Sequence, residues 1–182
     1  MSFFNIFLSK VKEIVEKIEQ GNPYPPEVYA VACLKDDTVY VFYTVGESPF
    51  EVSGKRQTLV INKCLEIGGK PIAELHTHPN GVTIPSLNDY ESFYEVATKL
   101  NTMEKTCVCR YHRESKELTC LCINLDLFRK NSKEVNTLIN LTQTLHENLR
   151  LRYPVSEKDA EIVEQYLAKV FRDGKDIKII KV

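Results

Sequence analysis

The first apolar pattern in the chain has the spacing of a helix. Apolar residues recur every three or four positions near residues 4–20, which predicts a helix with one apolar face. Gly21, Asn22 and Pro23 are expected to end this helix. The residues that form the pattern are Phe4, Phe7, Leu8, Val11, Ile14, Val15 and Ile18.

The middle of the chain has the shorter periods of strands. Runs rich in Val, Tyr and Phe over residues 27–35 and 38–45 flank Asp36 and Asp37, which predicts a hairpin with a tight polar turn, followed by a loop over 49–55. The elements expected after that loop are strands over 58–62 and 72–78, a short helix over 63–67, a helix over 86–100, and a second hairpin over 106–112 and 117–125.

Two consecutive helices are expected in the last third of the chain. Asn131 with Glu134, and Ser156 with Asp159, have the spacing of helix caps. Each pair opens a stretch with apolar residues three and four apart. A short edge strand over residues 177–182 could follow the second helix.

This order of elements predicts an α/β fold, in which helices pack on both faces of a mixed, partly antiparallel sheet. We expect one domain over residues 1–125. Residues 126–182 are interpreted as a helical extension that packs on the core or forms a partner surface.

Composition and charge narrow the function classes. The 182 residues are 43% hydrophobic and 27% charged, as in an ordinary globular protein. Lys and Arg number 24 against 25 for Asp and Glu, so no global positive field favours nucleic acid. The apolar start over residues 3–8 is too short for a membrane span and lacks the cationic flank of a signal peptide. We therefore expect a cytoplasmic protein without a membrane anchor.

Four of the six cysteines lie on the second expected hairpin, with their side chains on one face. Reduced, packed thiols are the favoured interpretation, because no export signal is found and disulfides are rare in most cytosols. Cross-strand disulfides and a second metal site are the alternatives. Cys33 and Cys64 are interpreted as core residues. The cross-strand pairs expected are Cys107 with Cys122 and Cys109 with Cys120.

Two of the four histidines stand close together before a proline. Because residues two apart on a strand project to one face, His76 and His78 can converge on one ion, while Pro79 turns the chain away. Asp89 is expected in the first turn of the next helix, close to the strand end. Two imidazoles and one carboxylate, with one position left to water, form a ligand set of catalytic zinc.

Simpler interpretations exist for the same residues. Ser86 and Asp89 also have the spacing of a helix capping box, and a histidine pair on a strand is compatible with an exposed polar edge. The coincidence of both features within fourteen residues favours the metal site. Ser86 can then serve both as the helix cap and as a catalytic hydrogen-bond donor.

The segment from His76 to Asp89 closely resembles the motif of the JAB/MPN (JAMM) metalloproteases, which runs His, any residue, His, Pro, a short loop, Ser, two residues, Asp. The resemblance covers about residues 1–125. It implies that His76, His78 and Asp89 bind Zn²⁺ and that Ser86 hydrogen-bonds the oxyanion. Glu27 matches the position of the family's glutamate, which is implied to be the general base.

The resemblance implies hydrolysis of a peptide or isopeptide bond, at the C-terminal tail of ubiquitin or of a ubiquitin-like sulfur-carrier protein. Two alternatives remain open. The chain could be a metal-free scaffold of the same fold, although its intact ligand set argues against this. It could also be a RadC-like protein associated with DNA repair, which the near-neutral charge disfavours.

Overall fold

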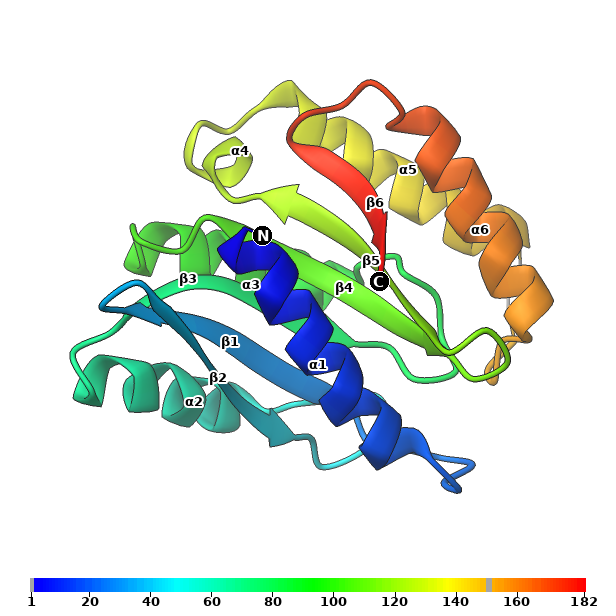
Figure 1. Cartoon of the computed structure of the whole chain (residues 1–182). Helices are drawn as coiled ribbons and strands as arrows, with labels where there is room; N and C mark the ends of the chain where they lie inside the picture. Colours follow the sequence, from blue (N-terminus) through cyan, green and yellow to red (C-terminus); the bar gives the residue numbers. More distant parts are fainter. Residues whose placement is uncertain (1, 150–151) are drawn as a thin grey trace.

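The computed structural model describes residues 2–149 and 152–182 (Figure 1). Its helices are α1 (Phe3–Glu19), α2 (Gly54–Glu66), α3 (Leu87–Lys99), α4 (Asp126–Arg129), α5 (Lys133–Leu149) and α6 (Glu157–Val170). Its strands are β1 (Val28–Lys35), β2 (Thr38–Val45), β3 (Lys70–Thr77), β4 (Lys105–His112), β5 (Glu117–Asn124) and β6 (Ile177–Lys181). Of the helices described, none combines the length and apolar character needed to cross a bilayer.

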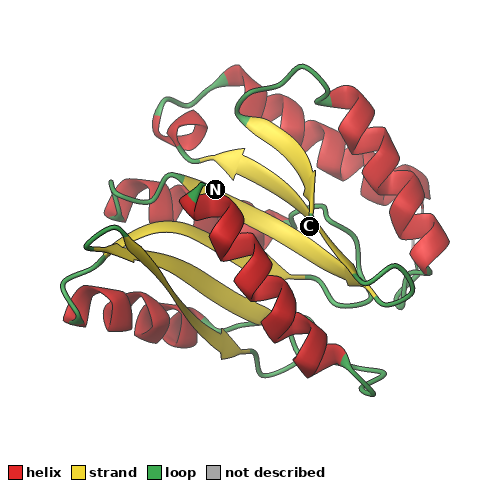
Figure 2. Cartoon of the chain, viewed as in Figure 1, coloured by secondary structure: helices red, strands yellow, loops and turns green. Residues whose placement is uncertain are grey.

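The six strands form one mixed sheet in the order β2-β1-β3-β4-β5-β6 (Figure 2). Only β3 and β4 run parallel, and every other neighbouring pair is antiparallel. Both predicted hairpins are present. Asp36 and Asp37 have φ of 49° and 61°, the left-handed conformation of a two-residue hairpin turn. The predicted fold class is confirmed.

Alternation along the strands divides the core between the two faces of the sheet. In β1, Ala30 and Ala32 face α1, whereas Tyr29 and Val31 face α2. Helix α1 crosses the first face, and α2 and α3 lie behind the second (Figure 1). His76 has the same parity on β3 as Glu74, so both project to the second face.

The strand predicted over residues 58–62 is wrong, because these residues lie inside α2. The run of Leu, Val and Ile suggested a strand. In the structure only Val60 and Cys64 are fully buried, and their spacing of four residues places them on one face of a helix. The Ser53 hydroxyl caps this helix by accepting from the Arg56 N–H.

One of the two predicted helix caps is also corrected. Ser156 caps α6 by accepting from the Asp159 N–H, as expected. Helix α5, however, begins at Lys133, so the preceding residue is Ser132 and not Asn131. The Ser132 hydroxyl accepts from the Glu134 N–H at 3.2 Å.

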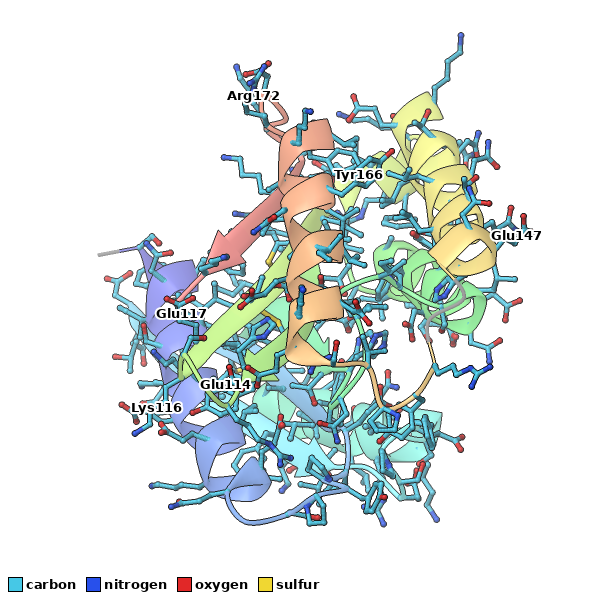
Figure 3. The ribbon with its side chains drawn as sticks, turned by 90° about the vertical axis from the view of Figure 1, so that its right-hand side faces the viewer. Glu114, Lys116, Glu117, Glu147, Tyr166 and Arg172 are labelled. Atoms are coloured by element: carbon cyan, nitrogen blue, oxygen red, sulfur yellow. A yellow bond between two sulfur atoms is a disulfide. The ribbon has the colours of Figure 1, made fainter. Side chains whose placement is uncertain are left out.

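The last third of the chain packs on the sheet. Strand β6 pairs with β5 and completes the sheet at that edge. Helix α5 shares a buried cluster with α3, while α6 packs beside α5 and β6 (Figure 3). A buried hydrogen bond of 2.6 Å between the hydroxyls of Tyr90 and Thr142 ties α3 to α5. Helices α5 and α6 therefore cover a sheet face, and α5 also contacts α3, the helix that carries Asp89.

All six cysteines are paired in disulfides, which corrects the interpretation of reduced thiols. The predicted register is confirmed, because Cys107 lies opposite Cys122 and Cys109 opposite Cys120. Their Cα atoms are 4.2 and 4.1 Å apart, the close spacing that brings cross-strand side chains together. The third disulfide joins Cys33 of β1 to Cys64 of α2, which were interpreted only as core residues.

Replacing both Cys33 and Cys64 by Ala should lower the free energy of unfolding by about 2–4 kcal/mol, because the unfolded chain loses a covalent constraint. Urea denaturation without reductant measures the difference. Intact mass provides the control: reduction of the wild-type chain should add about 6 Da, two hydrogens for each disulfide. Equal masses before and after reduction would contradict the pairing.

Candidate metal centre

Three of the residues singled out in the sequence meet at the end of β3. His76 is the penultimate residue of the strand, His78 follows it, and Asp89 lies in the first turn of α3. The Nε2 atoms of the two histidines are 3.1 Å apart. The Asp89 Oδ2 atom lies 3.2 Å from each of them. The structure thus brings all three predicted ligands to one point.

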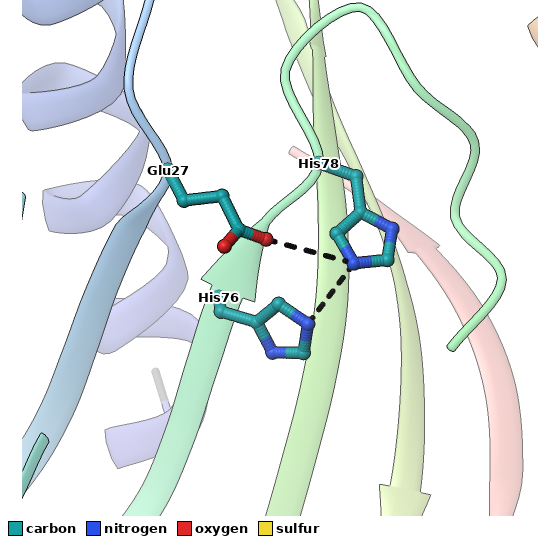
Figure 4. Close-up of side chains that lie close together, drawn as sticks. All are labelled: Glu27, His76 and His78. Carbon is teal, nitrogen blue, oxygen red and sulfur yellow. Dashed lines mark hydrogen bonds and ion pairs between the residues drawn. The ribbon is translucent and has the colours of Figure 1, made fainter. Parts of the chain in front are cut away.

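Glu27 reaches the same point from the neighbouring strand (Figure 4). It precedes β1, whose antiparallel register places Tyr29 opposite His76 and therefore brings Glu27 level with His78. Its side chain is only 7% exposed. The Oε1 atom of Glu27 lies 3.7 Å from the His78 Nε2 atom.

A tight turn after β3 orients the second histidine. Asn80 has a φ of 56°, which Asn tolerates, and the Gly81 N–H donates to the His78 carbonyl at 3.0 Å. The turn brings the Val82 carbonyl to 2.8 Å from the His78 Nδ1 atom. Because a carbonyl only accepts, the His78 Nδ1 atom carries a hydrogen, and the Nε2 atom is the one that faces His76 and Asp89. This is the arrangement of a histidine that ligates a metal.

The helix cap orients Asp89. The Ser86 hydroxyl accepts from the Asp89 N–H at 3.1 Å, and the Asp89 Oδ2 atom accepts from the Ser86 N–H at 2.8 Å. The capping-box interpretation is therefore correct. It does not exclude the metal site, because the same Oδ2 atom faces both histidines. The Ser86 hydroxyl hydrogen can still donate into the cleft.

The donor atoms have the spacing of metal ligands. With metal–ligand bonds of about 2.0–2.1 Å, neighbouring ligands of a tetrahedral site are about 3.3 Å apart. The three pairs here are 3.1–3.2 Å apart. Donor atoms of Glu27, His76 and His78 also lie within 4.8 Å of one another. The end of β3 thus holds a group that could bind a metal ion.

The two carboxylates differ in their distance from the imidazoles. Asp89 reaches both Nε2 atoms at 3.2 Å. Glu27 is 3.7 Å from the nearer one, that of His78, which is longer than the separation of two ligands on one small ion. Distance therefore favours Asp89 as the third ligand and Glu27 as its neighbour.

Opposite charges in this small volume shift each other's pKa. Burial disfavours a charged His76, but the Asp89 carboxylate outweighs burial and raises the pKa of His76 to about 9. Burial would raise the pKa of Asp89, yet the His76 imidazole holds that pKa well below its usual range. For Glu27, burial raises the pKa against the opposing effect of His76. Asp89 therefore stays ionised at neutral pH, as a metal ligand must.

Two cavities flank the site. The first, of about 430 Å³, is lined mainly by polar side chains that include Glu51, Gln57 and Asn88. The second, of about 270 Å³, is lined mainly by apolar side chains. Glu27, Phe50, Ser86 and Asp89 line both. A substrate that extends into both cavities would therefore pass the candidate metal ligands.

Several residues around the site could not be connected to it from the sequence pattern. Glu74 is buried on β3, where it accepts from the Tyr29 and Thr106 hydroxyls at 2.8 Å each. A glutamate two residues before His76 in an apolar strand was a usable signal. Phe50, His146 and Tyr153 line the apolar cavity from distant parts of the chain. No sequence pattern connected those three residues to the motif.

Comparison of the chain with models of known protein families and with curated proteins gives no match. The geometry of the site and the resemblance of its motif therefore carry the functional interpretation.

With Zn²⁺ as the probe, His78→Ala and Asp89→Asn should each weaken metal binding by about 100-fold or more. Mutation of residues that only hydrogen-bond to metal ligands already lowers metal affinity by about 10–100-fold, and loss of a ligand itself should cost more. Competition with a chromophoric chelator measures the affinity. His146→Ala is the matched control: it alters a histidine that lines the adjoining cavity and should bind normally. If Glu27→Gln loses zinc affinity and Asp89→Asn binds zinc normally, Glu27 is the third ligand and Asp89 is its neighbour.

Proposed function

We propose that the chain is a zinc-dependent hydrolase that cleaves a peptide or isopeptide bond. The observation that carries this proposal is the meeting of two imidazole nitrogens and one carboxylate oxygen, 3.1–3.2 Å apart, between two cavities. Catalytic zinc sites have three such protein ligands and keep one position open, whereas structural sites are closed by four. Zinc held there would act as a Lewis acid and lower the pKa of water to about 7.

Glu27 is the general base in this proposal. Its carboxylate lies beside the ligands, and the residue is 6% exposed and lines both cavities. From that position it accepts a proton from the attacking water and passes it to the leaving amine. A carboxylate that ligated the metal directly would be less available for this transfer, which agrees with its longer distance to His78.

Ser86 stabilises the oxyanion. Its hydroxyl oxygen accepts from the Asp89 N–H, and this contact orients the side chain at the start of α3. The hydroxyl hydrogen can then be donated to the carbonyl oxygen of the substrate, on which negative charge develops. The proximity of Ser86 to both cavities supports this role.

The substrate in this proposal is the C-terminal tail of ubiquitin or of a ubiquitin-like protein. The resemblance of the motif to JAB/MPN metalloproteases suggests this class. The sheet edge supports it, because β2 is an edge strand and its end at Val45 pairs with Val28, next to Glu27. An extended tail can add to such an edge by main-chain hydrogen bonds. Ser48 and Phe50, which follow β2, line the polar cavity.

Glu27→Gln should retain zinc and lose about two to four orders of magnitude in the rate of hydrolysis, because it removes the general base. Cleavage of ubiquitin-like fusion and conjugate substrates, with and without a chelator, measures the effect. Normal turnover in this variant would rule out the role of Glu27. Absence of chelator-sensitive cleavage by the wild-type protein on all such substrates would overturn the proposed activity.

Ser86→Ala should slow hydrolysis by about 100-fold to 1,000-fold while zinc stays bound, because one oxyanion donor is lost. Ser86→Thr is the matched control, since threonine keeps the hydroxyl and also caps helices. Thermal unfolding of both variants separates catalysis from capping. If each variant loses rate only in proportion to its loss of thermal stability, Ser86 is a structural cap and not an oxyanion donor.

A further inference from the structure

The smaller cavity has the composition of a binding pocket for an apolar side chain. Seven of its lining residues are apolar or aromatic: Pro49, Phe50, Pro79, Val82, Ile84, Tyr153 and Val155. Glu27, His78, Ser86 and Asp89 line it as well. We infer that it holds a bulky apolar side chain of the substrate residue next to the scissile amide. The inference rests on the proposed hydrolase function and names its specificity.

An aromatic pair lines this apolar cavity. The rings of Phe50 and Tyr153 meet edge to face, with centroids 4.6 Å apart. Phe50 is 67% exposed and Tyr153 is 38% exposed. Large aromatic side chains that stay this exposed beside a candidate catalytic centre gain free energy when an apolar group covers them.

Hydrogen bonds between the loop that follows β3 and the segment before α6 hold another part of the cavity lining in place. The Val155 N–H donates to the Asn80 carbonyl at 2.8 Å. The Arg110 guanidinium donates to the Gly81 carbonyl and, at 3.1 Å, to the Val155 carbonyl. The turn that orients His78 thus also positions Val155. The pocket is therefore formed before substrate binds, which lowers the entropic cost of binding.

Size and polarity identify the occupant. The volume of about 270 Å³ falls below the range of about 300–1,000 Å³ typical of drug-sized ligands, so it suits a single side chain. The polar cavity is lined by Glu51 and Glu74, neither of which lines the apolar cavity, and their carboxyl groups would disfavour an apolar side chain. A glycine at the same substrate position would leave the apolar walls in contact with water.

The test compares N-acetyl-phenylalanine methylamide with N-acetyl-glycine methylamide, added to the zinc-free, isotope-labelled full chain and followed by NMR. The phenylalanine probe should shift the amide signals of Val82, Ile84 and Val155, and the glycine probe should not. Phe50→Ala and Tyr153→Ala should each weaken this binding by about tenfold. The matched control is Tyr40→Ala, which removes an exposed tyrosine of β2 outside the pocket and should bind normally.

Equal shifts with both probes, or no shifts with the phenylalanine probe, would overturn the inference whatever the enzymatic result. Cleavage of a peptide panel by the zinc-loaded protein then tests specificity. Preference for a bulky apolar residue on one side of the cut bond supports the pocket, and indifference to that residue contradicts it. If phenylalanine binds but no peptide or conjugate is cut, the proposed hydrolase function fails while the pocket stands.

Discussion

Two imidazole nitrogens and one carboxylate oxygen lie within 3.2 Å of one another at the end of β3. Polar atoms so close together, and partly removed from water, are costly unless a cation or shared protons lie among them. The fold opposes their separation, because His76 is fixed on a central strand, the turn after it orients His78, and the capping box orients Asp89. The candidate metal centre, and every catalytic role proposed around it, depends on this convergence.

The site is completed by parts of the chain far from the motif. Helix α5 supports the helix of Asp89 through the Tyr90–Thr142 hydrogen bond. The segment before α6 supplies one wall of the apolar cavity and is tied to the site loop by Arg110. The C-terminal third therefore both stabilises the sheet and shapes the cleft.

The sequence predicted best where the constraint is local or periodic. Alternation in the two hairpins placed Cys107 opposite Cys122, and the Ser86 and Asp89 spacing predicted a cap, both of which the structure bears out. Prediction failed at residues 58–62, because a run of branched apolar residues fits either a buried strand or a helix face. Oxidation of the cysteines depends on the redox environment, which spacing does not encode.

The contribution of distant residues could not be predicted either. Phe50 reaches the apolar cavity from the segment between β2 and α2, whereas His146 and Tyr153 reach it from α5 and the segment before α6. The measurement that tests the central claim most directly is anomalous diffraction at the zinc edge from zinc-loaded crystals. The account predicts one peak about 2.0–2.2 Å from His76 Nε2, His78 Nε2 and Asp89 Oδ2. A zinc peak elsewhere, or a site closed by a fourth protein ligand, would contradict it.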